Sequence, residues 1–381
     1  MRRAEKMDVA VLGTGALGSG ALLSLAKRGL KVVGIDRFEP GHERGSSHGM
    51  TRVIRKAYFE APEYVPLLER AYALWDELER ESGESLFIRC GVLEVGPPDG
   101  EVVPGVLRAA QAHNLPVEAL TGAEVERRFP GFHVPEGFAG VFESDGGILR
   151  VERCVALQCE RAQKLGAELR SGRTILSVNR EGSSYLIQTD KGPIYANALV
   201  LTAGAWARDL LPELAPFLRV VRKVLLWYPV HDRGPQYLES EGSPVFLFEL
   251  PQGVFYGFPV IDDFGFKVAE HSGGDEVDDP LALDRNLYER DHAPVDRFLK
   301  RFVPNVVPGR ASKHAVCMYT LSPDLHPIAG LHPELPHVAF AAGMSGHGFK
   351  FSSAFGEALA DLALEGSTRH PMDIFAFERL L

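Results

Sequence analysis

The sequence predicts an α/β protein in which a discontinuous, Rossmann-like nucleotide-binding domain is combined with a substrate-binding domain built on an antiparallel β-sheet. Three features lead to this prediction: a glycine-rich strand–turn–helix–strand unit at 8–36, continuous apolar runs at 198–204 and 337–342, and a β-rich stretch at 220–271. Continuous apolar runs are typical of parallel strands buried on both faces. The expected segments are 1–85, 144–215 and 320–381 for the first domain, and 86–143 and 216–319 for the second.

The N-terminal unit carries the dinucleotide-binding fingerprint in its full structural context. An apolar run is followed by Gly13, Gly15 and Gly18 in the spacing G-x-G-x-x-G, then by a helical pattern and a β-branched run that ends at Asp36. The glycines permit a tight turn, close approach of the backbone to a pyrophosphate and close packing of the helix. Free N–H groups at the helix start attract phosphate, and Asp36 can accept a hydrogen bond from a ribose hydroxyl. The residues expected to contact the cofactor here are Gly13, Gly15, Ala16, Leu17, Gly18, Asp36 and Arg37.

A second glycine-rich loop, residues 343–348, lies near the other end of the chain. It follows the apolar run at 337–342 and precedes a predicted helix at 350–364. Two glycine loops at helix starts suggest one long cofactor held from two sides, which favours FAD over NAD, although the fingerprint alone fits both. Its cofactor-binding residues would be Gly343, Met344, Gly346 and Gly348. Neither Ser345 nor His347 lies in a G-x-S-x-G motif, which argues against a serine hydrolase nucleophile in this loop.

The composition narrows the class of protein further. With 41 basic and 51 acidic residues among 381, the net charge is −10, which argues against a nucleic acid or an anionic membrane as partner. The four cysteines form no C-x-x-C pair, so we expect neither a disulfide framework nor a metal site. Sparse, unpaired cysteines fit a reducing compartment, and we expect a cytoplasmic protein.

The remaining periodicities predict individual elements. An amphipathic pattern predicts a helix over 63–81, and apolar runs predict a strand at 91–95 and a hairpin formed by 245–250 and 254–258. A third strand is expected at 264–270, and a helix that is charged on one face over 275–304.

Four stretches of the chain together point to one family: GTGALGSGALLSLAKRG, GSSHGMTRVIRKAY, YGFPVIDDFGFKVAEH, and CMYTLSPDLHPIAG with GMSGHGFKFSS. They resemble the monomeric sarcosine oxidase family, which includes N-methyltryptophan oxidase and pipecolate oxidase among the D-amino-acid-oxidase-like flavoproteins. The stretches run in the family order from Gly13 to Ser353, so the resemblance covers nearly the whole chain. It implies an FAD-binding domain capped by an antiparallel β-sheet domain.

The resemblance also implies roles for the residues around the flavin. Cys317 matches the cysteine that carries FAD covalently, and Lys267 matches a lysine that promotes reaction with oxygen. A fixed cation beside the flavin would stabilise developing superoxide. The residues that match the flavin-lining positions are Ser47, His48, Thr51 and Arg52, with Lys350 also in contact.

Other matching residues would bind the substrate. Arg55 and Lys350 match the pair that holds a substrate carboxylate, for which arginine offers a bidentate fork and lysine a point charge. Tyr256 and Tyr319 match aromatic walls of the pocket, and His271 matches a residue near the amine. The catalytic set implied by the resemblance is Lys267, Arg52, His48 and His271, and the substrate-binding set is Arg55, Lys350, Tyr256, Tyr319 and Leu247.

The implied reaction is oxidation of the C–N bond of a secondary N-methyl amino acid with release of hydrogen peroxide, by an enzyme expected to be a monomer. Met50 and Leu247 depart from the pattern of the bacterial sarcosine branch, which carries Asp and Met at these positions. Alternative substrates are therefore L-pipecolate, proline-like cyclic amino acids and N-methyl-L-tryptophan. A more distant alternative is an NAD-dependent dehydrogenase that uses the same fingerprint.

Overall fold

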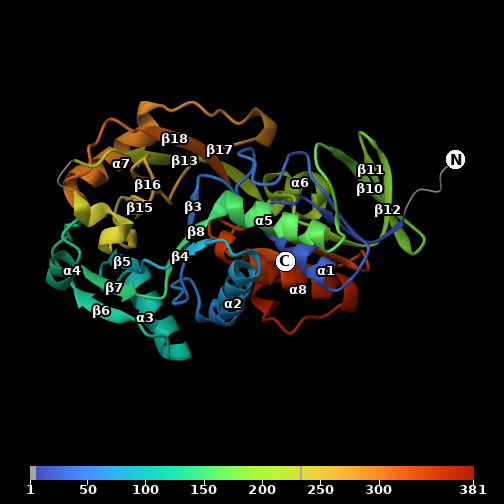
Figure 1. Cartoon of the computed structure of the whole chain (residues 1–381), viewed down its shortest axis with the longest axis horizontal. Helices are drawn as coiled ribbons and strands as arrows, with labels where there is room; N and C mark the ends of the chain where they lie inside the picture. Colours follow the sequence, from blue (N-terminus) through green and yellow to red (C-terminus); the bar gives the residue numbers. More distant parts are fainter. Residues whose placement is uncertain (1–5, 232–233) are drawn as a thin grey trace.

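The structure, a computed structural model, describes residues 6–231 and 234–381. Residues 1–5 and 232–233, which fall within the predicted domain segments, lie outside the described residues. Within this described part of the chain the strands form two large sheets and one small sheet. Figure 1 shows the two large sheets toward opposite ends of the long axis.

The first large sheet has eight strands among the described residues, in the order β10–β11–β12–β1–β2–β9, with β20 beside β12 and β19 beside β20. Strand β1 pairs in parallel with both β2 and β12, and β12 pairs in parallel with β20. The strands are β1 (Lys6–Leu12), β2 (Val32–Ile35), β9 (Glu168–Arg170), β10 (Ile175–Glu181), β11 (Ser184–Thr189), β12 (Gly192–Leu201), β19 (Ile328–Leu331) and β20 (Val338–Ala342). Segments from both ends and the middle of the chain thus share one sheet, as the three apolar runs predicted.

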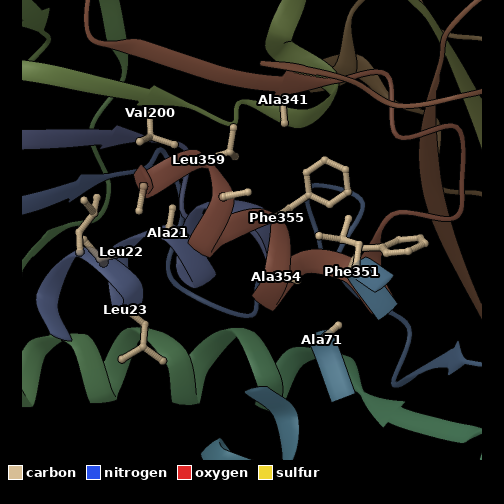
Figure 2. Close-up of a cluster of buried hydrophobic side chains, with 14 of the residues drawn as sticks. Ala21, Leu22, Leu23, Ala71, Val200, Ala341, Phe351, Ala354, Phe355 and Leu359 are labelled. Carbon is tan, nitrogen blue, oxygen red and sulfur yellow. The ribbon is translucent and has the colours of Figure 1, made fainter. Parts of the chain in front are cut away.

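Helices α1 (Ala16–Lys27), α5 (Val151–Lys164) and α8 (Ser352–Glu365) contact strands of this sheet, and helix α2 (Val65–Ser82) packs against α8. Figure 2 shows Ala354, Phe355 and Leu359 of α8 gathered with Ala21 and Leu22 of α1 in a buried apolar cluster. Helix α1 contacts both α8 and α5. The N-terminal helix is therefore covered by helices from the middle and the end of the chain.

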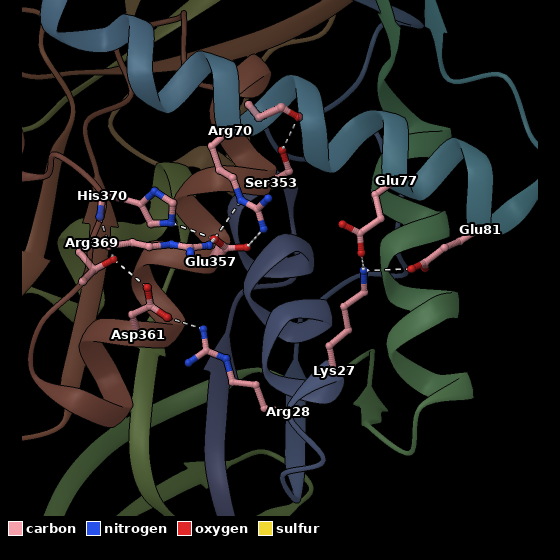
Figure 3. A network of polar contacts seen from close by, with 12 residues as sticks. Lys27, Arg28, Arg70, Glu77, Glu81, Ser353, Glu357, Asp361, Arg369 and His370 are labelled. Carbon is pink, nitrogen blue, oxygen red and sulfur yellow. Dashed lines mark hydrogen bonds and ion pairs between the residues drawn. The ribbon is translucent and has the colours of Figure 1, made fainter.

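A polar network joins three of these helices on their outer side (Figure 3). Glu357 of α8 accepts hydrogen bonds from Arg70 of α2 at 2.6 Å and from His370 at 2.9 Å. Arg28, at the end of α1, pairs with Asp361 of α8. The same three helices that share the apolar cluster are thus also joined by ion pairs.

The second large sheet has nine strands among the described residues, in the order β17–β13–β16–β15–β14–β5–β7–β6. Strand β13 also pairs with the ninth strand, β18, along most of its length. All pairs are antiparallel except β5–β14, so the antiparallel prediction holds with one parallel exception. The strands are β5 (Val92–Gly96), β6 (Glu118–Thr121), β7 (Ala139–Glu143), β13 (Arg219–Tyr228), β14 (Val245–Leu250), β15 (Gly253–Phe258), β16 (Phe266–Glu270), β17 (Asp275–Glu276) and β18 (Lys313–Leu321).

Helix α7 (Glu289–Phe302) covers this second sheet. Its Phe298 and Phe302 lie in one buried cluster with Phe246 and Phe248 of β14 and Phe255 of β15. The shorter helices α3 (Val102–His113), α4 (Gly122–Arg128) and α6 (Ala207–Leu210) complete the described α-helices. Aromatic side chains dominate this core, and each buries a large apolar area.

A small third sheet has the order β3–β8–β4, formed by β3 (Thr51–Ile54), β4 (Phe87–Ile88) and β8 (Gly147–Arg150). Figure 1 places these strands, in projection, between the two large sheets. Strand β3 was not predicted from the sequence, because it is short and is flanked by glycine and charged residues. This sheet matters for the site because β3 carries Arg52.

The predicted elements are confirmed with one exception. The helix predicted over 63–81 is α2, and the hairpin predicted at 245–258 is β14–β15. The helix predicted over 275–304 is wrong in its first half, because helix α7 begins only at Glu289. Arg222 of β13 donates hydrogen bonds to the Asp284 and Asn286 carbonyl groups and holds this segment as irregular chain. The helix α3 was not predicted at all.

The contact between helices α1 and α8 gives the first testable prediction. A Cβ atom on Gly356 would lie 2.3 Å from the Gly20 carbonyl carbon and 2.4 Å from the Ala21 nitrogen, so backbone meets backbone. We expect Gly356→Ala to lower the free energy of unfolding by about 1–3 kcal/mol. At an open helix position the same change would raise the free energy of unfolding by about 1 kcal/mol. A decrease for Gly356→Ala would therefore identify the close backbone contact as its cause.

Urea unfolding followed by circular dichroism measures this effect. Glu365→Ala, at the exposed last residue of the same helix, serves as the control and should shift the midpoint little. A Gly356→Ala variant as stable as the wild type would show that the two helices can separate without cost.

Candidate active site

Two adjoining cavities lie where the sheets and helices meet. The larger cavity, of about 220 Å³, runs from the start of helix α1 to strand β18, and the smaller one encloses about 60 Å³. The described residues that line both cavities are Arg52, Tyr319, Gly346 and Phe349. The larger cavity is also lined by predicted cofactor residues from both ends of the chain: Gly13, Gly15, Ala16, Leu17, Asp36, Arg37, Ser47, Gly343, Met344 and Gly348.

Asp36, directly after β2, holds the glycine turn together. Its Oδ2 atom accepts hydrogen bonds from the Thr14 N–H at 2.7 Å and the Thr14 hydroxyl at 3.3 Å, and its Oδ1 atom accepts from the Phe38 N–H at 2.9 Å. Gly13 has φ +94° in this turn, a conformation that side chains rarely adopt. Asp36 therefore fixes its own chain besides lining the cavity, which the fingerprint did not reveal.

Gly18 lines neither cavity but has a packing role. A Cβ atom there would lie 1.8 Å from the Gly13 carbonyl oxygen and 2.6 Å from Thr202 Oγ1. The third glycine of the fingerprint thus lets helix α1 lie against the turn, as its spacing predicted.

Unpartnered donors on the wall of the larger cavity fit an anionic, hydrogen-bonding ligand. Arg37 Nη1 and Trp206 Nε1 are buried and make no hydrogen bond with the described residues. The guanidinium carbon of Arg37 lies 5.8 Å from the Trp206 ring centroid, and both side chains line the cavity. Buried polar groups are normally satisfied, so these donors beside a helix start suit the diphosphate and ribose groups of a dinucleotide such as FAD.

Arg52 lies at the junction of the two cavities and contacts Cys317. Its Nη2 atom donates to the Ser46 carbonyl oxygen at 2.9 Å and lies 3.5 Å from Cys317 Sγ. The Cys317 thiol also lies 3.5 Å from the Ser46 oxygen, is fully buried, and precedes the cavity-lining Met318. Residues 271 positions apart are therefore brought into contact at this junction.

Lys267 lies one layer behind the cavity walls. Its Nζ atom donates to the Gly49 carbonyl at 2.6 Å, the Thr51 carbonyl at 3.0 Å and the Thr51 hydroxyl at 2.9 Å. Burial lowers the pKa of Lys267 well below its usual range, and the Arg52 guanidinium lowers it further. The three oxygen acceptors match the three donors of an ammonium ion. An anion placed against this wall would favour the charged form.

His48 is buried, and neither of its ring nitrogens has a hydrogen-bond partner among the described residues. Burial, followed by the charge of Arg52, lowers the pKa of His48 to about 3. The imidazole is therefore neutral at pH 7 and adds no charge to the two cations beside it. Like Lys267 and Thr51, it lies outside the set of described residues that line the cavities.

Aromatic side chains form one wall of the smaller cavity. Tyr256, Tyr319, His271 and Leu247 line it. The hydroxyl oxygens of the two tyrosines are 3.4 Å apart, and His271 Nδ1 is 3.4 Å from the Tyr319 oxygen. Burial lowers the pKa of His271 to about 3, so this ring is also neutral at pH 7.

Lys350 supplies a buried cation to the smaller cavity. Its Nζ atom donates to the His347 carbonyl at 3.0 Å and to the Tyr58 hydroxyl at 3.2 Å. Burial, followed by the nearby Arg55, lowers the pKa of Lys350 to about 7. Since both of its partners are neutral, the ammonium group can still pair with a ligand anion.

Arg55, the other predicted carboxylate-binding residue, is engaged by two carboxyl groups. Its Nη2 atom lies 3.2 Å from Glu60 Oε2, and its Nε atom lies 3.0 Å from Glu94 Oε1. Both glutamates line the smaller cavity. A ligand carboxylate bound by Arg55 would therefore share this guanidinium with two other carboxyl groups.

Several lining residues were not predicted from the sequence, and four of them, Glu60, Glu94, Trp206 and Phe349, matter most for the site. Glu94 had a signal, because it interrupts the apolar run at 91–95 and a strand buried on both faces rarely holds an unpaired charge. The other three carried no local pattern that separates them from ordinary surface or core residues.

Comparison with known proteins places this geometry in a family. The sequence model for "FAD dependent oxidoreductase" matches residues 8–362. Monomeric sarcosine oxidase of Arthrobacter sp. (strain TE1826) is 38% identical over 377 residues, which are 98% of this chain and 96% of that protein. N-methyl-L-tryptophan oxidase of Yersinia pestis (strain Pestoides F) is 37% identical over 97% of this chain and 98% of that protein.

A solved structure of an amino acid oxidase also shares the fold of this chain. NikD, described as an unusual amino acid oxidase essential for nikkomycin biosynthesis, superimposes in its open form with a TM-score of 0.82 at 26% identity, covering 98% of this chain and 97% of that one. No helix in the described parts of this chain is long and apolar enough to cross a bilayer. The chain is therefore a member of the FAD-dependent oxidoreductase family, and within it belongs with the monomeric sarcosine oxidases and the N-methyl-L-tryptophan oxidases.

Proposed function

We propose that this flavoprotein oxidises the C–N bond of a small secondary N-methyl amino acid, with sarcosine as the first candidate, and passes the electrons to oxygen to form hydrogen peroxide. The observation that carries the proposal is the junction of the two cavities at Arg52, Tyr319, Gly346 and Phe349. A ligand in the smaller cavity would lie directly against the end of a cofactor in the larger one. The relatives named as sarcosine and N-methyl-L-tryptophan oxidases support the class of substrate.

The chain's own residues would bind and orient the substrate. Lys350 and Arg55 would hold the carboxylate, while Tyr256, Tyr319 and the neutral His271 would enclose the amine. Bound FAD would supply the two-electron acceptor. Tyr256, Tyr319 and the neutral His271 place no negative charge beside the amine at pH 7, so the amine can bind as the neutral base, which alone has the lone pair that helps to expel hydride.

The size of the smaller cavity favours small substrates. About 60 Å³ suits sarcosine or a compact ring such as L-proline or L-pipecolate better than the indole of N-methyl-L-tryptophan. The NAD-dependent dehydrogenase alternative is set aside by the family assignment. We also retain as proposals the domain segments given above, a monomeric state and a cytoplasmic location. For the location, the support is that all four cysteines are free.

A peroxide-release assay tests the substrate assignment. Under air, we expect kcat/KM to be highest for sarcosine, followed by L-proline or L-pipecolate and then N-methyl-L-tryptophan, with glycine as the control. Activity should rise with pH as the bound amine loses its proton. Preference for glycine over all four secondary amines would refute the proposal.

Covalent attachment of FAD at Cys317 is a second part of the proposal. The buried thiol lies against Ser46 and Arg52, which line the larger cavity. A thioether bond to the flavin methyl carbon would release two protons and two electrons, which oxygen can take up. After acid precipitation we expect the wild-type pellet to stay yellow, and the flavin of Cys317→Ala to pass into the supernatant. Cys154→Ala, at a buried cysteine of helix α5, is the matched control and should keep its yellow pellet. A colourless wild-type pellet contradicts attachment.

The third part assigns Lys267 to the reaction with oxygen. The Lys267 ammonium group is held by Gly49 and Thr51 behind the residues that line the larger cavity. From there it would stabilise negative charge that develops during the reduction of oxygen. Lys267→Met should slow aerobic reoxidation by roughly a hundredfold or more, as the loss of one preorganised electrostatic donor typically does, and slow anaerobic reduction by substrate much less. Stopped-flow absorbance separates the two half-reactions.

Lys313→Met is the matched control for Lys267→Met. The Nζ atoms of Lys267 and Lys313 lie 5.1 Å and 5.6 Å from the centroid of the same Trp227 ring. Lys267 donates to the Gly49 and Thr51 carbonyl groups, whereas the Lys313 Nζ atom lies 3.9 Å from the Phe264 ring centroid. We expect its removal to leave both half-reactions close to those of the wild type. Equal losses in the two half-reactions of Lys267→Met would assign Lys267 to the architecture of the site instead.

A further inference from the structure

We propose that Glu94 couples the binding of a substrate carboxylate to the uptake of one proton and so sets the pH range in which the smaller cavity accepts carboxylates. The inference rests on the proposed function, because it describes regulation of the same site. Glu94 acts here as a specificity-determining residue that works through Arg55.

The geometry places Glu94 in direct competition with a ligand. Glu94 lies in the middle of strand β5, is 1% exposed and lines the smaller cavity. Its Oε1 atom is 3.0 Å from Arg55 Nε, yet neither atom makes a well-oriented hydrogen bond with the described residues. A guanidinium and a carboxyl group with unfilled hydrogen-bonding capacity therefore face the space where the substrate carboxylate would bind.

The charges around Glu94 make a further anion costly. Two glutamates besides Glu94 face the same guanidinium region: Glu60 contacts Arg55 at 3.2 Å, and Glu143 lies on the neighbouring strand β7. The Glu143 oxygens accept from the Lys56 and Ala57 N–H groups at 2.8 Å, which stabilises their charge. A ligand carboxylate would become the fourth anion of this group, and like charges held close together favour protonation of one member.

Glu94 is the member best suited to take the proton. Glu60 retains contact with solvent, with a side chain 19% exposed, and Glu143 has the two backbone donors. Burial raises the pKa of Glu94 to about 7, with Arg55 opposing and Glu143 and Glu60 adding to the rise. His271 and His347, which also line the cavity, have pKa values lowered to about 3 by burial, so they stay neutral throughout this range.

Lys350 is the competing proton acceptor, because burial lowers its pKa to about 7 as well. Its ammonium already has two oxygen acceptors, the His347 carbonyl and the Tyr58 hydroxyl. Those acceptors favour the protonated form before a ligand arrives. The Arg55 Nε donor that faces Glu94 at 3.0 Å is not oriented for a hydrogen bond, so it stabilises the charged form less, and we assign the proton to Glu94.

The sign of the pH dependence follows from this assignment. Below about pH 7 Glu94 is protonated and leaves Arg55 to the ligand. As pH rises through this value Glu94 ionises, so a carboxylate must displace it from Arg55 and pull in a proton. Binding that takes up one proton weakens about tenfold for each pH unit.

The experiment measures proton uptake directly in the FAD-loaded wild-type protein. The probe is methoxyacetate, in which an ether oxygen replaces the amine of sarcosine, so the ligand itself does not titrate between pH 6 and 9. Isothermal titration calorimetry at pH 8 in buffers of different ionisation enthalpy should give an uptake approaching one proton per bound ligand. The dissociation constant should rise between pH 7 and 9 and be flat below pH 6.

Three variants identify the proton acceptor. Glu94→Gln should bind methoxyacetate without proton uptake and, at pH 8.5, about tenfold or more tighter than the wild type, with similar affinity at pH 6. Glu60→Gln is the matched control, since it removes the other carboxylate on Arg55 and should keep the uptake. Lys350→Met should bind more weakly but also keep the uptake.

Several results would overturn the inference. They are the absence of proton uptake by the wild type, retention of uptake in Glu94→Gln, and loss of uptake in Lys350→Met with retention in Glu94→Gln. If sarcosine is oxidised but methoxyacetate binds without uptake, only this inference fails. If neither sarcosine oxidation nor methoxyacetate binding occurs at any pH, the proposed function itself has failed.

Discussion

The closeness of helix α1 to helix α8 is the constraint on which the rest of this structure depends. Gly20 and Gly356 meet without intervening side chains, and an added Cβ on either would lie 2.3–2.6 Å from backbone atoms of the other segment. Only this spacing allows the loop at 343–348, which precedes α8, to lie at the same cavity as the turn at 13–18. The contact between two short helices thus converts two glycine loops, more than three hundred residues apart, into one cofactor site.

The site is built by burying charges that are costly to bury. Arg55, Glu94, Lys267 and Lys350 are all at most 3% exposed. Burying an ion removes several kcal/mol of hydration, which a protein can offset only by paired charges and hydrogen bonds. Lys267 has three oxygen partners, whereas the Arg55–Glu94 pair keeps unfilled hydrogen-bonding capacity. Buried charges with unfilled hydrogen-bonding capacity at a cavity wall are expected where a ligand completes the site.

Local patterns predicted most of the framework around this site. The spacing of Gly13, Gly15 and Gly18 predicted the turn, and the alternation around Gly253 predicted the β14–β15 hairpin, because both depend on neighbours within a few residues. The helix predicted over 275–304 was wrong before Glu289, because the hydrogen bonds of Arg222 to the chain at 284–286 outweighed the helical periodicity there. Strand β3 was missed because its partner β8 is nearly a hundred residues away.

The sequence by itself determined the α/β class, the nucleotide-binding turn and the family resemblance, since these depend on residue types at short, fixed spacings. Only the tertiary structure decided what each charged group faces. It set Glu94 of β5 against Arg55, which directly follows strand β3 of a different sheet, and Asp36 against the Thr14 N–H that it fixes. Electrostatic and hydrogen-bonding partners are chosen by distance and burial in three dimensions, and neither quantity is encoded in the spacing of residues along the chain.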